Sequence, residues 1–223
     1  MTDFKELSAY ASAFSSAEND LLRRMEKQAR EIYIPIMQPS AVALLQQLIR
    51  WINAEHILEL GTAIGYSAIR MRLAAGSSAK IISIERDPEM IRSAREHIRE
   101  LGFSDSIGIV EGDATDQLDS VKQNAPYDLI LIDAAKAQYE KLFNAYARWL
   151  RPGGIIVTDN VFFHGLVCHI DDVRKKQLNR LVHKVDDYNH FLAGRTDFDT
   201  VFLTVGDGLA ISTKKRLKET EES

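Results

Sequence analysis

The sequence contains a single cysteine, Cys168, among 223 residues. One cysteine cannot form an internal disulfide, so a disulfide-stabilised fold is excluded and a reducing compartment is expected. No apolar run approaches the roughly 18 residues that a membrane-spanning helix needs. The first residues, MTDFKELSAYASAF, include acidic and polar side chains from the start, unlike a signal peptide. We therefore expect a cytoplasmic protein.

An excess of positive charge is also absent. The formal net charge is −4, which disfavours a generic polyanion-binding protein but allows a local basic face. The chain has no internal repeat, low-complexity tract or Pro/Gly/Ser-rich linker. Its 45% hydrophobic and 27% charged residues are typical of a globular protein. The sequence predicts one compact unit, in which an N-terminal helical extension (1–54) precedes the main domain (55–223).

Hydrophobic periodicity predicts helices in the N-terminal extension. Residues 3–32 are expected to be helical because five apolar residues fall on one helix face: Leu21, Leu22, Met25, Ala29 and Ile32. Pro35 and Pro39 interrupt this pattern. Ser40 is the candidate N-cap of the next helix.

Beyond residue 55, short apolar runs alternate with helical segments. Five runs are predicted strands: 56–60, 80–85, 107–110, 127–133 and 154–158. Helices are predicted after them, near 65–74, 88–101, 115–120, 137–149 and 171–190. This alternation predicts a doubly wound α/β fold with a mostly parallel sheet. Two further β-like runs, 198–205 and 209–213, flank Gly206-Asp207-Gly208, so the seven-stranded sheet should end in an antiparallel hairpin.

The first predicted strand ends in a glycine-containing turn, Glu59-Leu60-Gly61-Thr62-Ala63-Ile64-Gly65. Glycine lets the backbone approach a ligand closely, and the following helix start offers free N–H groups to an anion. Ala63 stands where the dinucleotide fingerprint G-x-G-x-x-G needs its second glycine, and no lysine forms a P-loop. The turn suits a cofactor that has a carboxylate but no pyrophosphate, and Ser67 could bond that carboxylate.

Acidic residues end the next two predicted strands. Glu85 lies about where an acidic residue usually binds ribose hydroxyls. Asp113 and Ala114 could bracket an adenine edge with a carboxylate and a backbone amide. Taken singly, Gly61 also fits a plain turn, Glu85 a surface acid and Asp113 a helix cap. Appropriate groups at three successive strand ends together favour S-adenosylmethionine.

The fourth and fifth predicted strands end in Asp133 and in Asp159-Asn160. Neighbouring strand ends of a parallel sheet converge on one crevice, so these residues should meet beside the cofactor. Two carboxylates and an amide carbonyl form an oxygen-only set that suits Mg²⁺ or a similar divalent cation. A metal makes an acceptor hydroxyl more acidic, and Lys136 can take its proton. The simpler alternatives are a solvated lysine and an ordinary loop cap.

The chain resembles the metal-dependent O-methyltransferase family that includes catechol and caffeoyl-CoA O-methyltransferases. The similarity runs from about Met37 through the closing hairpin and rests on ELGTAIGYS, IERD, EGDA, LIDAAK, RPGGIIVTDN and VGDG; IDAAK followed by TDN is the most specific part. It implies that the metal ligands are Asp133, Asp159 and Asn160. It implies catalytic roles for Asp133 and for the general base Lys136. It also implies that the cofactor contacts are Met37, Gly61, Ser67, Glu85, Asp113, Ala114 and Asp133.

The acceptor hydroxyl is less well determined. Ala137 stands where plant members usually carry an acid, which weakens a phenylpropanoid assignment. The stretch IYIPIMQPSAVALL is similar to the bacterial tRNA 5-hydroxyuridine methyltransferases, which implies 5-hydroxyuridine in tRNA as substrate. Its 5-hydroxyl lies beside the 4-carbonyl, so one chelate would serve both this ring and a catechol. The alternatives are a small catechol-like or hydroxycinnamoyl-CoA acceptor and, in another class, a non-catalytic adenosyl-binding module.

A tRNA substrate also requires a phosphate-binding surface. Three basic clusters are candidates: Arg23, Arg24, Lys27 and Arg30; Arg174, Lys175, Lys176, Arg180 and Lys184; and Lys214, Lys215, Arg216 and Lys218. A solvated helix face or tail explains each of them equally well. Phe162, Phe163 and His164 could stack on a flipped base or line a pocket for a phenol. The amphipathic N-terminal helices suggest a homodimer.

Overall fold

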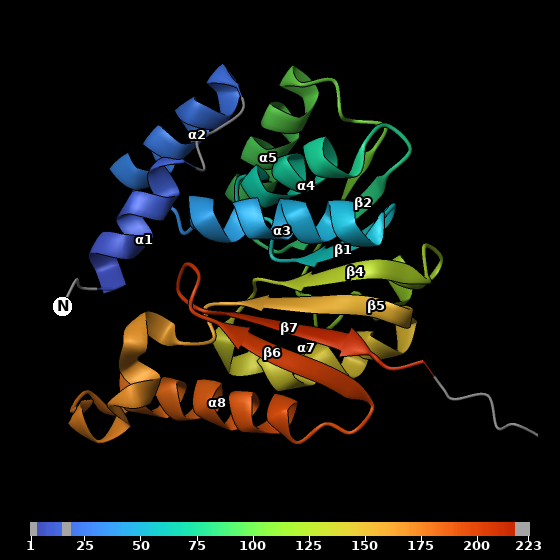
Figure 1. Ribbon diagram of the computed structural model, residues 1–223. Helices are drawn as coiled ribbons and strands as arrows, with labels where there is room; N and C mark the ends of the chain where they lie inside the picture. Colours follow the sequence, from blue (N-terminus) through green and yellow to red (C-terminus); the bar gives the residue numbers. More distant parts are fainter. Residues whose placement is uncertain (1–3, 15–18, 217–223) are drawn as a thin grey trace, which may run out of the picture.

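A sheet of seven strands runs through the part of the chain that the computed structural model describes, residues 4–14 and 19–216 (Figure 1). Its strand order is β3-β2-β1-β4-β5-β7-β6. The strands are β1 (His56–Leu60), β2 (Lys80–Glu85), β3 (Ile107–Glu111), β4 (Tyr127–Ile132), β5 (Leu150–Asp159), β6 (Phe198–Leu203) and β7 (Leu209–Lys214). The first five are mutually parallel, and β7 is antiparallel to both β5 and β6. The predicted doubly wound α/β fold with a closing hairpin is confirmed.

Helices cover both faces of the sheet. They are α1 (Phe4–Ala13), α2 (Asp20–Glu31), α3 (Pro39–Ile52), α4 (Tyr66–Ala75), α5 (Pro88–Glu100), α6 (Leu118–Lys122), α7 (Tyr139–Tyr146) and α8 (Lys176–Ala193). Short 3₁₀ turns are η1 (Lys136–Gln138), η2 (Ala147–Trp149), η3 (Phe163–Cys168) and η4 (Ile170–Asp172). Figure 1 shows α3, α4 and α5 on one face and α7 and α8 on the other, with α2 beside α5. Among the described residues, no helix is both long and apolar enough to cross a membrane.

The N-terminal extension shares the core of the main domain. Met25 of α2 and Leu45 and Ile49 of α3 are fully buried in one cluster with Ile57 of β1 and Leu129 of β4. Each fully buried side chain of this size contributes about 1.5–3 kcal/mol to folding. Helices α2 and α3 are therefore integral to the sheet's upper layer, and a second cluster fills the layer beneath α7 and α8.

Two expectations for the N-terminal part are wrong. The single helix expected over 3–32 is interrupted at Asn19, whose backbone is extended (φ −147°, ψ 171°) and whose side chain accepts the N–H of Leu22 at 2.9 Å. This local bond starts α2 as a separate helix; residues 3 and 15–18 lie outside the described range. Ser40 is not the N-cap of α3, because Gln38 holds that position and Pro39 begins the helix. Proline suits a first helical turn, where its missing N–H costs nothing.

The strand order places a topological switch at the centre of the sheet. The chain leaves β1 toward β2 and β3, and then returns to place β4 on the other side of β1. Ligands of open α/β sheets bind at such a point, in the crevice outside the carboxyl ends of the strands. The turns that follow β1 and β4 should therefore line the functional site.

Candidate active site

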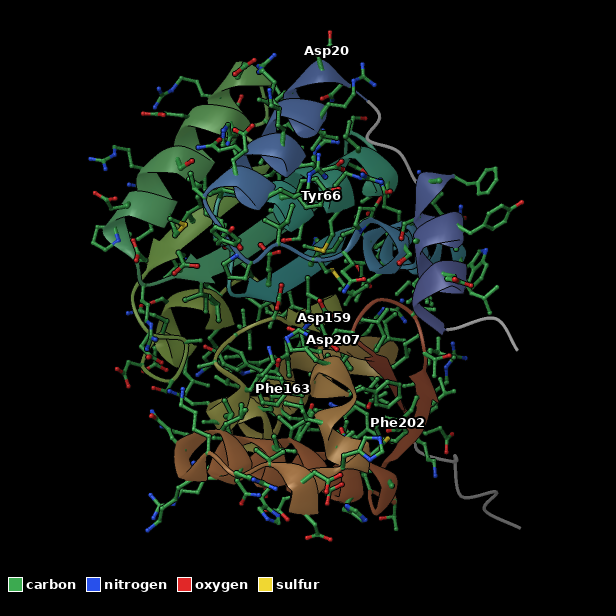
Figure 2. All side chains as sticks on the ribbon, turned by 90° about the vertical axis from the view of Figure 1, so that its left-hand side faces the viewer. Asp20, Tyr66, Asp159, Phe163, Phe202 and Asp207 are labelled. Atoms are coloured by element: carbon green, nitrogen blue, oxygen red, sulfur yellow. The ribbon has the colours of Figure 1, made fainter. Side chains whose placement is uncertain are left out.

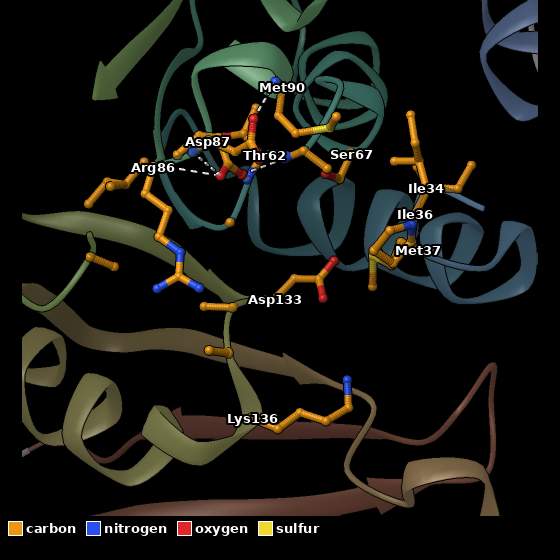
Figure 3. A pocket seen from close by; sticks show the side chains of 18 of the residues that line it. Ile34, Ile36, Met37, Thr62, Ser67, Arg86, Asp87, Met90, Asp133 and Lys136 are labelled. Atoms are coloured by element: carbon orange, nitrogen blue, oxygen red, sulfur yellow. Dashed lines mark hydrogen bonds between the residues drawn. The ribbon is translucent and has the colours of Figure 1, made fainter. Parts of the chain in front are cut away.

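A cavity of about 570 Å³ opens over the carboxyl ends of β1, β2 and β4 (Figure 3). Nine of the ten residues predicted for the site line it: Met37, Gly61, Ser67, Glu85, Asp113, Ala114, Asp133, Lys136 and Asn160. The tenth, Asp159, is buried at the end of β5. Figure 3 shows the Asp133 side chain lying between Ser67 and Met37 on one side and Lys136 on the other. The structure thus brings the predicted residues together, while their roles stay predictions.

Gly61 brings the turn after β1 against the end of β4. Its backbone has φ +98°, which favours glycine, and a Cβ built there would lie 2.1 Å from the carbonyl oxygen of Asp133. The amide of Asp133 donates to the carbonyl of Leu60 at 2.9 Å, which fixes the same contact from the other side. Glycine is therefore required at position 61 because the turn after β1 lies directly against the end of β4. The same lack of a side chain leaves the backbone open to a ligand.

Glu85 holds the turn that the cofactor is expected to contact. Its Oε2 accepts the amides of Thr62 (3.1 Å) and Ala63 (2.8 Å). Its Oε1 accepts the amides of Arg86 (2.8 Å) and Asp87 (3.0 Å). Four backbone bonds fix this carboxylate at the cavity wall, where its predicted contact with ribose hydroxyls needs its remaining acceptor capacity.

The hydroxyl of Ser67 donates to a carboxylate of the protein itself, Glu59 in β1. Glu59 also accepts bonds from the hydroxyls of Ser83 and Thr62 and is fully buried. Burial raises the pKa of Glu59 to about 7, although hydrogen bonds from the neighbouring hydroxyls, that of Ser67 above all, oppose the shift. No role for Glu59 is predicted from the sequence. The available signal was an acid inside the apolar run HILEL, because a buried carboxylate requires hydrogen-bond partners.

Asp113 caps its own turn. Its Oδ1 accepts the amide and the hydroxyl of Thr115, each at 2.9 Å, and its Oδ2 accepts a bond from Arg86 at 3.0 Å. The Thr115 amide, helped by the Thr115 hydroxyl and by Arg86, holds the pKa of Asp113 below its usual value. The carbonyl of the next residue, Ala114, accepts the Tyr146 hydroxyl at 2.6 Å. Arg86 lines the cavity and was missed in the sequence, where nothing marked it among other surface arginines.

Asp133 and Asp159 follow adjacent, parallel strands, since Ile132 of β4 pairs with Thr158 of β5. Burial raises the pKa of Asp133 to about 6, with Lys136 opposing the shift. Burial and then the charge of Asp133 raise the pKa of Asp159 well above its usual value. A buried carboxylate beside a half-buried one that repels it is unfavourable without a cation between them. Their arrangement is therefore one that a bound cation would stabilise.

Lys136 and Asn160 connect the ends of β4 and β5. The Nζ of Lys136 donates to Oδ1 of Asn160 at 2.7 Å and lies 5.5 Å from the centroid of the Phe163 ring. Asn160 has φ +58°, a left-handed conformation that asparagine tolerates better than most residues. The backbone N–H of Asn160 donates to Oδ1 of Asp159 at 2.7 Å. One carboxylate, one amide and one amine are therefore held as a connected group.

The β6–β7 hairpin supports the segment that follows Asn160. Asp207, which is 8% exposed, accepts the amide of His164 on Oδ1 at 2.5 Å, and its carbonyl accepts the amide of Phe162 at 3.1 Å. The charge of Asp207 also contributes to the raised pKa of Asp159, and Figure 2 shows these two aspartates side by side. In the sequence Asp207 marked only a tight turn, so its support of the segment that follows Asn160 was missed.

The comparison with known families decides the class. Residues 12–215 match a family model described as O-methyltransferase. The chain belongs to the O-methyltransferase family. This membership confirms the predicted enzyme class, an S-adenosylmethionine-dependent O-methyltransferase, and does not favour the alternative of a non-catalytic binding module.

Relatives of this O-methyltransferase agree with that class. A catechol O-methyltransferase of Niastella koreensis is 31% identical over an aligned length of 221 residues, and the match covers 95% of this chain and 98% of the relative. A crystal structure of a candidate caffeoyl-CoA O-methyltransferase from Staphylococcus aureus is 37% identical, with a TM-score of 0.87, and the match covers 93% of this chain and 98% of that one. An O-methyltransferase of Bacillus cereus, solved in complex with SAH, is 25% identical with a TM-score of 0.81 and coverages of 94% and 97%.

Proposed function

We propose that this O-methyltransferase uses S-adenosylmethionine and a divalent cation such as Mg²⁺ to methylate 5-hydroxyuridine in tRNA, giving 5-methoxyuridine. The observation that carries the proposal is the pair of adjacent carboxylates, half-buried Asp133 and buried Asp159, joined through Asn160 to Lys136 at the cavity. The solved complex of the Bacillus cereus relative with SAH supports the cofactor.

The residues present fit a divalent cation. Asp133, Asp159 and Asn160 would hold it through oxygen atoms, the donors that Mg²⁺ prefers. No group of three or more His, Cys, Asp or Glu side chains suited to a metal occurs in the described part of the chain, so the amide of Asn160 is needed to complete the set. When bound, the cation would stabilise the two carboxylates and make an acceptor hydroxyl more acidic.

The side chains around the site have distinct tasks in the proposed reaction. Lys136 accepts the proton of the acceptor hydroxyl at Nζ, which Asn160 holds in place. Phe163, 9% exposed, excludes water from one side of that amine. The turn at Gly61 keeps the cofactor side of the cavity within reach of Asp133. When bound, S-adenosylmethionine supplies the methyl group for in-line displacement by the resulting oxygen nucleophile.

A chelating site favours an acceptor with two adjacent oxygens. In 5-hydroxyuridine these are the 5-hydroxyl and the 4-carbonyl, and the similarity of the IYIPIMQPSAVALL stretch supports this ring. A small catechol-like or hydroxycinnamoyl-CoA compound is the second candidate. It is favoured by the Niastella koreensis relative, which is named a catechol O-methyltransferase.

The acceptor is tested by transfer of labelled methyl to tRNA carrying 5-hydroxyuridine and, separately, to catechol. Matched tRNA with uridine at the same position is the control. Labelling of the 5-hydroxyuridine tRNA at one nucleoside supports the first acceptor. Labelling of catechol alone supports the second and removes tRNA from the proposal, whereas no transfer to either would contradict both.

A homodimer through the N-terminal helices is also proposed. Leu7, Tyr10 and Phe14 of the α1 region are 56%, 69% and 74% exposed. Large apolar side chains gathered on one short helix are typical of a contact surface. Sedimentation equilibrium should show twice the mass of one chain, and a monomer across micromolar concentrations would reject the dimer.

A further inference from the structure

A strongly basic surface lies on the first half of α8. Residues 174–184, RKKQLNRLVHK, contain five Lys or Arg and no Asp or Glu. The five cations, here called the α8 basic face, are all exposed: Arg174, Lys175, Lys176, Arg180 and Lys184. Within the described ranges none of the five forms an ion pair. This stretch therefore concentrates five cations between two acidic pairs, Asp171-Asp172 and Asp186-Asp187, on a protein whose formal net charge is −4.

Most described members of the other two basic clusters already have a hydrogen-bond or ion-pair partner within the protein. In α2 the ion pairs are Arg23 with Asp20, Arg24 with Glu100, and Lys27 with Glu31. Near the C-terminus, Lys214 donates to the carbonyls of Ala147 and Leu150, and Lys215 lies 3.0 Å from Asp199. Lys218 lies outside the described residues. Of the three candidates for a phosphate-binding surface, the structure thus singles out the α8 basic face.

Helix stability does not explain these cations. Arg174, Lys175 and Lys176 stand at the N-terminal end of α8, where the helix dipole favours negative charge. The first turn contains no acidic residue. A sequence selected only for a stable α8 would carry its basic residues at the other end.

Helix α8, which carries most of the α8 basic face, packs beside the turns that follow β4 and β5. Helix α8 packs against η1, which carries Lys136, and against η3, which follows Asn160. Val182 and Val185 contact Phe163 in a small apolar cluster. Figure 1 shows the N-terminal end of α8 on the same side of the molecule as the carboxyl end of β5. Charge on this helix therefore lies on an element that packs against the turns following β4 and β5.

The spacing of the cations suits a chain of phosphates. Lys176, Arg180 and Lys184 lie at i, i+4 and i+8, so they form one stripe along the helix. At a rise of 1.5 Å per residue they follow one another at steps of about 6 Å. Lysine and arginine stripes of this kind bind a nucleic-acid backbone by releasing its condensed counterions.

We propose that the α8 basic face binds the phosphates of the tRNA strand that carries the target nucleotide. The inference rests on the proposed function, because it assigns the surface that holds the same substrate. Phosphate contacts on α8 fix the register of the strand, while the target ring enters the cavity beside Lys136. Specificity for the ring stays with the cavity, and affinity for tRNA comes largely from α8.

The test compares two triple variants of the full-length protein. Lys176→Gln/Arg180→Gln/Lys184→Gln removes the α8 stripe, and Arg23→Gln/Lys27→Gln/Arg30→Gln is the control with the same change in charge on α2. The binding constant for tRNA is measured over a series of salt concentrations. Each lost phosphate contact lowers the slope of log K against log salt by about 0.7–0.9, so the α8 variant should lose about 2–3 in slope. The control should lose less than 1.

A second measurement separates binding from chemistry. For the free nucleoside 5-hydroxyuridine, kcat/KM should be unchanged in the α8 variant, because one nucleoside has no backbone to bind. An unchanged salt slope in the α8 variant, or equal losses of slope in both variants, would overturn the inference about α8. The proposed function would still stand if the wild type methylated tRNA. Loss of turnover with a CoA thioester instead of tRNA would assign the surface to a different substrate. No methylation of either tRNA or nucleoside by the wild type would overturn both proposals.

Discussion

The amine of Lys136 and the side-chain oxygen of Asn160 lie 2.7 Å apart, although 24 residues separate them in the chain. Lys136 follows β4 and Asn160 follows β5, and the parallel pairing of these strands brings the two side chains together. A candidate base and a candidate metal ligand are therefore positioned by one hydrogen bond. In the proposed reaction this bond sets where the proton of the acceptor is taken up.

Replacement of Lys136 by alanine should lower kcat by about 10²- to 10⁴-fold, the usual contribution of a general base. The affinity for S-adenosylmethionine should change little, because the lysine acts on the acceptor. Single-turnover kinetics and cofactor titration measure the two quantities separately. Lys141→Ala, at an exposed lysine of α7, is the matched control. Full turnover of Lys136→Ala across neutral pH would remove Lys136 from the mechanism.

Gly61→Ala should destabilise the protein more than Gly76→Ala. Both glycines have positive φ (+98° and +87°), but only at Gly61 does a Cβ clash, 2.1 Å from the carbonyl oxygen of Asp133. The backbone strain is of the same kind at both sites, about 1–3 kcal/mol. The clash should add about 1–3 kcal/mol and should weaken cofactor binding. Equal free energies of unfolding for the two variants would show that the turn yields without cost.

Glu59→Gln should change the pH dependence of stability. In the folded protein the pKa of Glu59 is about 7, above its usual 4.5. The folded state therefore holds a proton that the unfolded chain has lost between these values. Wild-type stability should fall as pH rises from about 4.5 to 7 and then level off. The glutamine variant lacks this loss. Its free energy of unfolding relative to that of the wild type should therefore rise by up to about 3 kcal/mol between pH 4.5 and 8.

Urea unfolding of both proteins at pH 4.5 and pH 8 measures this difference. Ser106→Ala, at a serine whose hydroxyl donates to the nearby carbonyl of Phe103, controls for a general effect of substitution. A stability difference between Glu59→Gln and wild type that stays constant across pH would show that Glu59 does not carry the shift.

The sheet and the convergence of the site could be predicted because local signals define them. The run HILEL is bounded by polar residues, and β1 forms over the expected His56–Leu60. Asp133, Asp159 and Asn160 end apolar runs, and parallel strand ends necessarily meet at one edge. The closing hairpin followed from Gly206-Asp207-Gly208 in the same way.

Long-range contacts were not predictable in this way. Nothing near Ser67 in the sequence indicates that its hydroxyl donates to Glu59, because the partner comes from another element. The segment 33–36, Tyr-Ile-Pro-Ile, lines the cavity through tertiary packing, although in the sequence its proline indicates only a break between two helices. The break at Asn19 was missed because the apolar periodicity continues across the segment, while a single side-chain bond to Leu22 determines where α2 begins.

Metal-dependent turnover tests the central claim most directly. The measurement is the initial rate of labelled methyl transfer after exhaustive chelation, and again after Mg²⁺ is restored, for wild type and Asp159→Ala. We expect wild-type transfer to vanish on chelation and return with the cation. We expect Asp159→Ala to stay inactive in both conditions while it still binds S-adenosylmethionine. Transfer that survives chelation, or an active Asp159→Ala variant, would contradict a catalytic cation held by Asp133, Asp159 and Asn160.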